Sequence, residues 1–424
     1  MGKLVLIDLD GTLTDTAHEK FKPQKDGQAD TIVESIPIIN GAKDFLAKLK
    51  ALGHTPVIIS DSHYKYVNPI AQNLFNIPAL SLADKPNAIK TKEFVTANWN
   101  ISNFGDQCIV IGDTWLDIEL GRSLNCPTIL TEFYKATSIE ERDGIGNAWR
   151  HYKSGPTYVT DSFNRIIEII EEPSKYLLAA EAIFHNVKSD QSIKFFTDTS
   201  DNSLVAFRSL GRQNAGECDV NGIATKYFEF QKADRTESTV KLLAEALDNY
   251  LKFVINSAPH IKWDLLTYVS DKKTTTPPNK MSQLYEFVST PIYKEKIFEW
   301  SDDIEGNIKS QKNYKERREF VLKNVFIKTN TELKDKGVIV IDDQFTTGGT
   351  AFAFRNMLRD KGVKNILFVT LFYLITTVES EKLCPTCKKR LVVKIKRSDG
   401  TKFLSCPLPA YGGNGCGYIQ NIQQ

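Results

Sequence analysis

The sequence predicts an α/β protein with two parallel-sheet domains followed by a small β ribbon. Short segments rich in Val and Ile alternate with amphipathic segments of helical length, and this alternation occurs twice along the chain. The length of 424 residues favours two or three folded units, since a domain usually takes about 100–200 residues. Four of the seven cysteines lie beyond residue 380, which indicates a separate small unit. We expect domain boundaries near 1–165, 170–380 and 381–424.

Composition and hydrophobicity limit the classes of protein to which this chain can belong. Hydrophobic residues make up 41% of the chain, and the net charge is +2, so the overall charge indicates no particular partner. No apolar run approaches the roughly 18 residues of a membrane span, and the N-terminal apolar stretch reaches aspartate after a few residues without a cleavage site. We expect a soluble, cytoplasmic protein with no membrane partner.

In the first domain, apolar runs predict strands and the segments between them predict helices. The residues 42–53 place Phe45, Leu46, Leu49 and Leu52 at helical spacing and end in glycine. Strands that alternate with helices form a parallel, Rossmann-like sheet. The predicted strands are 4–7, 56–60, 108–112 and 127–130.

In the second domain the alternation begins after an acidic helix at 166–176. The predicted elements are a helix at 242–255, strands at 263–270 and 338–341, a helix at 351–362 and a strand at 365–373. We predict a second Rossmann-like parallel sheet. Residues 272–330 are rich in Pro, Thr and mixed charge, and they predict a loop-rich, mobile region.

The segment LVLIDLDGTLTD places Asp8 and Asp10 just past the first strand. Ligands of a parallel sheet bind outside the carboxyl ends of its strands, so chemistry is expected here. The alternative is that these acidic residues only end a strand in a solvated turn.

The first domain resembles the haloacid dehalogenase superfamily of phosphatases. The resemblance covers roughly residues 1–165 and rests on four elements in order: DLDGT, VIIS ending at Ser60, Lys85 followed by Pro86, and VIGDTWLD with Asp113 and Asp117. It implies that Asp8 is the nucleophile that forms an aspartyl phosphate. It also implies that Asp10 protonates the leaving oxygen and later activates water.

The same resemblance implies a Mg²⁺ site, because a hard cation prefers oxygen ligands. Asp8, Asp113 and the Asp10 backbone carbonyl would hold the ion, and Asp117 would support them. Ser60 would bind the phosphoryl group. Lys85 would neutralise the carboxylates, with Lys90 and Lys92 as rivals for that role. Only about 45 residues separate DLDGT from Ser60, so we expect little or no cap domain.

The stretch VIVIDDQFTTGGT at 338–350 resembles the phosphoribosyl pyrophosphate motif of type I phosphoribosyltransferases. The resemblance implies that Asp342 and Asp343 hold the ribose hydroxyls. It also implies that the loop Thr346, Thr347, Gly348, Gly349 and Thr350 wraps the 5′-phosphate. The alternatives are a simple Gly-rich turn or another nucleotide fold. A Walker loop is excluded, because no lysine follows the glycines.

Two further segments belong to this interpretation. Residues Ser270, Asp271, Lys272 and Lys273 follow an apolar run where the family carries its pyrophosphate loop. Lys315, Arg317 and Arg318 are predicted either to form a lid over pyrophosphate or to lie on a solvated helix face. The base that accepts the ribose is not identified by the sequence.

The C-terminal tail contains Cys384, Cys387, Cys406 and Cys416, which can bind Zn²⁺ tetrahedrally. The tail resembles the four-cysteine zinc ribbon of bacterial type I topoisomerases, although nine residues separate its second pair of cysteines. Residues 381–424 hold eight Lys or Arg and two acidic residues, a net charge of +6. Basic and aromatic side chains favour single-stranded nucleic acid as a partner, and the alternative is a purely structural ribbon.

Together these features predict an enzyme of nucleotide metabolism with two activities. A Mg²⁺-dependent phosphatase would be fused to a phosphoribosyltransferase that uses phosphoribosyl pyrophosphate as a substrate. The substrates would be nucleotides or ribose phosphates, in salvage, modified-nucleoside synthesis or defence. The alternative is a nucleic-acid-binding regulator that senses such a ligand.

Overall fold

The chain folds into two compact units, one holding residues up to 173 and from 375 onward, and the other holding most of 174–374. The prediction of an α/β protein is confirmed in both units. The computed structural model describes residues 2–133, 147–213, 229–232, 234–270, 279–304, 306, 308–311, 314–376, 379–395, 402–406 and 416–421.

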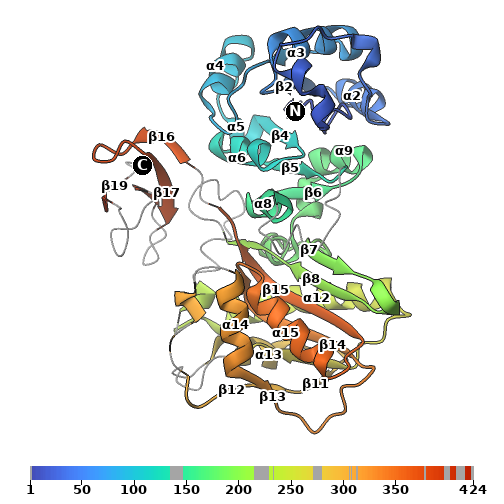
Figure 1. The fold of residues 1–424 in the computed structure, drawn as a ribbon, viewed down its shortest axis with the longest axis vertical. Helices are drawn as coiled ribbons and strands as arrows, with labels where there is room; N and C mark the ends of the chain where they lie inside the picture. The colour runs from blue at the N-terminus through green and yellow to red at the C-terminus, as the bar shows by residue number, and fades with distance from the viewer. Residues whose placement is uncertain are drawn as a thin grey trace. The chain divides into compact units, whose positions relative to one another are not determined.

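The first unit contains a six-stranded, fully parallel sheet of order β3-β2-β1-β4-β5-β6 (Figure 1). Its strands are β1 (Leu4–Ile7), β2 (Thr55–Ile59), β3 (Ala79–Leu80), β4 (Cys108–Gly112), β5 (Thr128–Thr131) and β6 (Tyr158–Thr160). The strand order reverses direction between β1 and β4. This switch point is where open α/β sheets bind ligands.

Helices cover this sheet, because its strands are apolar on both faces. Leu4, Leu6 and Val110 pack in one cluster with Val95 and Leu120 of the flanking helices, while the alternate strand residues are also buried. The helices of this part are α1 (Lys22–Lys25), α2 (Ala42–Ala51), α3 (Tyr64–Ile70), α4 (Ile89–Asn98), α5 (Phe104–Gln107), α6 (Trp115–Ser123), α8 (Asn147–Lys153) and α9 (Phe163–Glu171). Between β1 and α2, α1 and two 3₁₀ turns at Glu19–Phe21 and Val33–Ser35 are the only helical segments.

The second unit contains a sheet of order β11-β10-β14-β15-β8-β7, with β9 also paired to β15. Its strands are β7 (Ile193–Asp198), β8 (Val205–Ser209), β9 (Arg212–Gln213), β10 (Leu265–Tyr268), β11 (Tyr293–Lys294), β14 (Gly337–Phe345) and β15 (Asn365–Leu374). The prediction of a purely parallel sheet is wrong here, since β7 runs antiparallel to β8. The other pairs are parallel.

The helices of this unit lie on both faces of its sheet (Figure 1). Ile339 and Leu367 pack with Leu243 and Leu284 of α12 and α13. On the opposite face, Phe352 of α15 meets Phe207 with ring centroids 4.8 Å apart. The helices are α10 (Ala179–Ala182), α12 (Glu237–Ser257), α13 (Lys280–Phe287), α14 (Tyr314–Asn324) and α15 (Gly349–Asp360).

The prediction of a loop-rich region at 272–330 is wrong for most of the part that the structure describes. This stretch carries α13, β11, α14 and an antiparallel pair, β12 (Phe298–Trp300) with β13 (Val325–Ile327). Within α14, only Val321 and Asn324 are buried, so the helix has no apolar stripe to reveal it.

A four-stranded antiparallel sheet ends the chain. It is formed by β16 (Glu379–Leu383), β17 (Arg390–Ile395), β18 (Lys402–Ser405) and β19 (Ile419–Asn421). Its small core is Leu391 and Leu404 with the cysteine cluster. Across the described parts of the chain, none of the helices has the length and apolar character needed to cross a bilayer.

Candidate functional site

Three carboxylates meet at the switch point of the first sheet. Asp8 follows β1 and Asp113 follows β4, and these strands are neighbours with Ile7 opposite Ile111. Asp117 lies in the first turn of α6. One oxygen of each carboxylate lies within 4.8 Å of the others. The structure therefore brings together the three carboxylates that were predicted for the metal site, Asp8, Asp113 and Asp117.

Lys85 joins two of these carboxylates. Its Nζ lies 2.6 Å from Asp8 Oδ1 and 2.5 Å from Asp117 Oδ1, and its side chain is only 5% exposed. Burial acts to lower the pKa of Lys85, but Asp117 and Asp8 outweigh it and raise the pKa well above its usual value. The rival Lys90 donates instead to the carbonyl of Leu82. Lys85 is thus a fixed cation at the centre of the carboxylates.

Two glycines allow the backbone to lie directly against the carboxylates. Gly11 has φ +90°, and a Cβ there would lie 2.3 Å from Asp113 Oδ2, so only glycine fits. A Cβ on Gly112 would lie 2.2 Å from Asp117 Cγ. Thr114 donates its backbone N–H and its hydroxyl to Asp117 Oδ2, at 3.1 and 2.7 Å. This capping box orients Asp117 before any ligand is present.

The electrostatics of the cluster fit a divalent cation. Burial raises the pKa of Asp8 well above its usual range, and burial together with Asp117 raises the pKa of Asp113 to about 7. Asp113 Oδ1 is buried and has no hydrogen-bond partner among the described residues. Crowded carboxylates with an unpaired buried oxygen are a donor set that suits Mg²⁺. Asp8 and Asp113 would hold the ion.

Asp10 lies in a different hydrogen-bond cluster. Its Oδ1 accepts from the hydroxyls of Thr16 and Tyr66 at 2.6 and 2.9 Å, and its Oδ2 accepts from Ser62 at 2.9 Å. Lys25 Nζ lies 3.9 Å from Oδ1. Burial and Asp10 raise the pKa of the Tyr66 phenol, so this group remains a donor at neutral pH. The Asp10 carboxylate is therefore oriented by hydroxyls, apart from the Asp8, Asp113 and Asp117 cluster.

Ser60 follows β2 at the same edge of the sheet and is 1% exposed. Its Oγ accepts the Ser62 amide at 3.1 Å. The neighbouring Asp61 accepts the Lys85 backbone N–H at 2.8 Å, which ties the Lys85 loop to the end of β2. The loop after β2 thus positions both the lysine and the serines.

The second site lies at the end of β14. Asp342 is 8% exposed, and its Oδ1 accepts the Asp343 amide at 2.8 Å. Asp343 Oδ2 is bonded to Lys280 Nζ and accepts from Gln231 at 3.0 Å. Burial and Asp343 raise the pKa of Asp342, whereas Lys280 lowers the pKa of Asp343 despite its burial. The pKa values of the two adjacent carboxylates are therefore shifted in opposite directions.

The loop after these aspartates leads directly into α15. Gly348 has φ +78° and caps the helix. The hydroxyl of Thr346 is bonded to Arg317 of α14, and the N–H of Gly349 lies 3.4 Å from the Thr347 hydroxyl. The N–H groups of Thr346, Thr347 and Gly348 meet no acceptor in the described residues. This is the open amide geometry of an anion site at a helix N-terminus.

The predicted pyrophosphate loop is only partly described. Ser270 is 5% exposed, its hydroxyl donates to the Phe298 carbonyl at 2.8 Å, and its carbonyl accepts from Trp300 Nε1 at 2.6 Å. Ser270 is thus bonded within the fold. Asp271, Lys272 and Lys273 lie outside the described residues.

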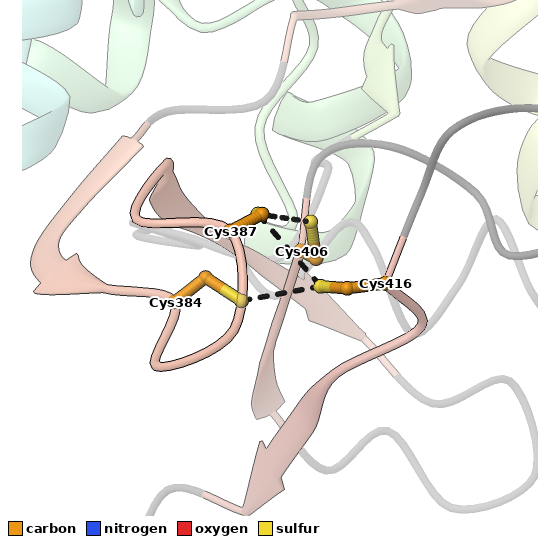
Figure 2. Close-up of side chains that lie close together, drawn as sticks. All are labelled: Cys384, Cys387, Cys406 and Cys416. Carbon is orange, nitrogen blue, oxygen red and sulfur yellow. Dashed lines mark hydrogen bonds between the residues drawn. The ribbon is translucent and has the colours of Figure 1, made fainter.

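The four cysteines of the tail converge on one point (Figure 2). The Sγ atoms of Cys384 and Cys416 are 3.2 Å apart, those of Cys387 and Cys406 are 3.5 Å apart, and those of Cys387 and Cys416 are 3.7 Å apart. Four thiolates around tetrahedral zinc would lie about 3.8 Å from one another. Although burial acts to raise it, hydrogen bonds lower the pKa of Cys384 to about 6. The cluster fits Zn²⁺.

Several site residues had no signal in the sequence. Ser62, Tyr66, Thr16 and Lys25 surround Asp10. Of these four residues, Ser62 alone had a weak signal, because it follows Ser60 by two residues directly after β2. In the second site, Gln231 and Lys280 reach Asp343 from distant segments, and no motif marks them.

Comparisons with known proteins match the first part of the chain to solved structures. A predicted phosphoglycolate phosphatase from Haemophilus somnus 129pt shows 18% identity and a TM-score of 0.30, covering 40% of this chain and 98% of its own. A hydrolase of the haloacid dehalogenase superfamily from Ehrlichia chaffeensis shows 16% identity and a TM-score of 0.26, covering 31% of this chain and 89% of its own.

A phosphonoacetaldehyde hydrolase-like protein from Oleispira antarctica shows 16% identity and a TM-score of 0.30, covering 40% of this chain and 92% of its own. No protein-family model matches the chain, and no curated protein matches it. The three identities are below 25% and the TM-scores are below 0.5.

Proposed function

We propose that the first site is a Mg²⁺-dependent phosphatase that works through an aspartyl phosphate. The observation that carries the proposal is the Asp8, Asp113 and Asp117 cluster at the switch point, with Lys85 buried between Asp8 and Asp117. A purely structural ion pair needs one carboxylate for one lysine. Three close carboxylates, of which Asp8 and Asp117 are buried, leave negative charge against one lysine. A divalent ion can balance this charge and so admit a phosphoryl group.

The residues then have distinct roles. Lys85 engages Asp8 Oδ1, which leaves Oδ2 to attack phosphorus. The new bond joins Asp8 to phosphorus as the ester oxygen leaves, and Asp10 supplies that oxygen with a proton. Water then attacks phosphorus, Asp10 takes its proton, and Asp8 is regenerated. When bound, Mg²⁺ supplies positive charge that offsets the charge of the phosphoryl oxygens.

The test is phosphate release from a panel of phosphomonoesters and nucleotides by the full chain. We expect release with Mg²⁺ and none from the Asp8→Asn variant, with a matched Asp15→Asn variant remaining active. Failure of the wild-type chain to release phosphate from every compound would refute the phosphatase.

We further propose that the second site is a phosphoribosyltransferase that uses phosphoribosyl pyrophosphate. Asp342 and Asp343 supply carboxylate acceptors for two ribose hydroxyls, and the open amides after them donate hydrogen bonds to the 5′-phosphate. In the reaction the bond from C1′ to pyrophosphate breaks and a bond from C1′ to a nitrogen base forms. The protein contributes mainly by positioning the reactants and by stabilising the charge that develops on them.

Fusion of the two sites favours a pathway role. Transfer would make a phosphorylated riboside, and loss of its phosphate would give a nucleoside and make the sequence effectively irreversible. Salvage, modified-nucleoside synthesis and defence all fit this chemistry. The test is to supply phosphoribosyl pyrophosphate with a panel of bases and to identify phosphorylated and dephosphorylated ribosides by mass spectrometry. Absence of any riboside would refute the transferase.

A second candidate function is regulation through nucleic-acid binding, and the converged cysteines favour it. A zinc ribbon would present Lys388, Lys389 and Arg390 beside the metal knuckle, and such cations bind phosphates. Binding of a labelled single strand at low salt tests this function. Absence of binding, or binding that Cys384→Ser leaves unchanged, would exclude it.

A further inference from the structure

The side chain of Arg317 on α14 lies against the loop at 346–350. Its Nη1 is bonded to the hydroxyl of Thr346, the first residue of the loop. Its Nε donates to the carbonyl of Gln311 at 3.0 Å, which fixes the plane of the guanidinium. The arginine is thus directed at the loop and not at solvent.

The backbone of α14 is packed equally tightly on the start of α15. A Cβ on Gly349 would lie 2.5 Å from the Tyr314 carbonyl oxygen and 2.9 Å from Arg317 Cβ. The neighbouring Lys315 and Glu316 are exposed. Arg317 therefore lies on the face of α14 that contacts the loop.

The charge of Arg317 is not balanced inside the described chain. No carboxylate among the described residues pairs with it, and its Nη2 has no acceptor there. Desolvation lowers its pKa, which reflects a guanidinium removed from water without a counter-charge. A half-buried cation without an anion is costly unless a ligand supplies one.

The unused donors lie on neighbouring groups. Arg317 is bonded through Nη1 to the hydroxyl of Thr346, and the open amides belong to Thr346 and to the two residues that follow it. Guanidinium forks bind phosphate through two parallel hydrogen bonds. We infer that Arg317 is a phosphate ligand of the second site, which recognises the 5′-phosphate of the phosphoribosyl group together with the 346–350 loop.

This inference rests on the proposed phosphoribosyl site and deepens it. It assigns the specificity for a phosphorylated sugar to a side chain that the motif itself does not contain. It also separates Arg317 from pyrophosphate, which is the anion that a lid would cover. Binding of a sugar phosphate and binding of pyrophosphate can therefore distinguish a ligand of the 5′-phosphate from a lid residue.

The test is calorimetric titration of the full chain with ribose 5-phosphate and, separately, with pyrophosphate in the presence of Mg²⁺. All chains carry Asp8→Asn, so that the first site cannot turn over the sugar phosphate. We expect Arg317→Gln to weaken ribose 5-phosphate binding by about 10- to 100-fold, the usual effect of losing a charged hydrogen bond. Pyrophosphate binding should change by less than about twofold.

Two variants control the experiment. Lys323→Gln removes an exposed charge from the same helix and should leave both affinities unchanged. Arg317→Lys keeps the charge and should recover part of the ribose 5-phosphate affinity, while thermal melting verifies that each variant is folded. The inference is overturned if Arg317→Gln binds ribose 5-phosphate as the parent does, or if it loses both ligands equally.

The outcomes also separate this inference from the proposed function. Arg317-dependent binding of ribose 5-phosphate without transfer to any base would refute the transferase and support the phosphate ligand. Absence of ribose 5-phosphate binding in the parent chain would refute the phosphate cradle and the role of Arg317 together.

Discussion

Lys85 is the single side chain on which the first site depends most. It is nearly buried and contacts both Asp8 and Asp117, so in the proposed phosphatase it would position the nucleophile and offset the charge of the phosphoryl group. A rotatable ammonium with three donors can serve two carboxylates and a phosphoryl oxygen together.

Lys85→Met is expected to reduce phosphatase turnover by roughly 100- to 1,000-fold, as loss of one preorganised donor typically does. Breaking this buried pair should also lower the free energy of unfolding by about 3 kcal/mol. Steady-state kinetics and thermal melting measure the two effects. Lys90→Met is the matched control, because among the described residues Lys90 donates to the Leu82 carbonyl and not to the carboxylates. Equal loss in both variants would contradict the role of Lys85.

The pKa of Asp113 predicts how Mg²⁺ binding depends on pH. Its folded pKa of about 7 is above its ordinary value of 3.8, so the folded chain retains a proton that the unfolded chain has lost. Metal-free stability should therefore fall as pH rises from about 4 to 7. Mg²⁺ must displace this proton, so its affinity should rise about tenfold per pH unit below 7 and then level off.

Mg²⁺ titrations followed by thermal shift between pH 5.5 and 8.5 measure this dependence. Asp113→Asn should abolish the slope together with the tight binding. An affinity that does not change over this range would show that Asp113 does not hold the ion.

At the level of single residues, the sequence predicted the groups that lie in or next to a recognisable motif and missed several that reach the sites from other segments. Asp8, Asp113 and Ser60 could be placed because parallel strands end at one edge. Tyr66, Gln231 and Lys280 could not, since their approach to Asp10 and Asp343 depends on how α3, α13 and the segment before α12 run in space. The spacing of residues along the chain does not predict how these segments run.

Among the elements, α14 and α15 form the contact that shapes the second site. Gly349 lies where a side chain would strike the Tyr314 carbonyl, so the small residue allows α14 to approach the loop. This contact is what presents Arg317 to Thr346.

Gly349→Ala is therefore expected to push α14 away from the loop. Forced overpacking of this kind usually lowers stability by about 1–3 kcal/mol, and affinity for phosphoribosyl pyrophosphate should fall at least tenfold as the cradle opens. Calorimetric titration measures the affinity, and the phosphatase activity of the same sample is the internal control. Unchanged affinity in a folded variant would show that the contact does not support the loop.

Some strands and helices were predicted correctly from the sequence, and others were missed. The strands near 4–7, 108–112 and 365–373 were placed correctly, because runs buried on both faces are continuous in Val, Ile and Leu. The antiparallel β7 was missed, since exposed Lys194 and Thr197 interrupt its apolar residues and its pairing with β8 is decided by tertiary contacts. Helix α14 was missed because it is polar nearly all round.

Over the whole molecule, the proposed functions assign separate chemistry to three clusters of side chains. The carboxylate cluster, the aspartate pair with its amide loop, and the four cysteines are each built from residues of their own sheet. Separate sites predict that each can be removed without the others.

The cysteine cluster gives one such prediction. One equivalent of zinc per chain is expected by elemental analysis, because four thiolates complete a tetrahedral site. Cys384→Ser should lower zinc content well below one and destabilise the ribbon while Mg²⁺-dependent phosphatase activity persists, with Cys108→Ser as the control that keeps its zinc. Full zinc occupancy in Cys384→Ser would show that this cluster is not the metal site.

The most direct measurement follows phosphate and pyrophosphate release in parallel from three full-length chains: wild type, Asp8→Asn, and Asp342→Asn combined with Asp343→Asn. Two independent sites predict that Asp8→Asn loses phosphate release and keeps pyrophosphate release, while the double variant does the reverse. Loss of both products in either folded variant, or release of neither product by the wild type, would contradict two carboxylate-based phosphate sites in one chain.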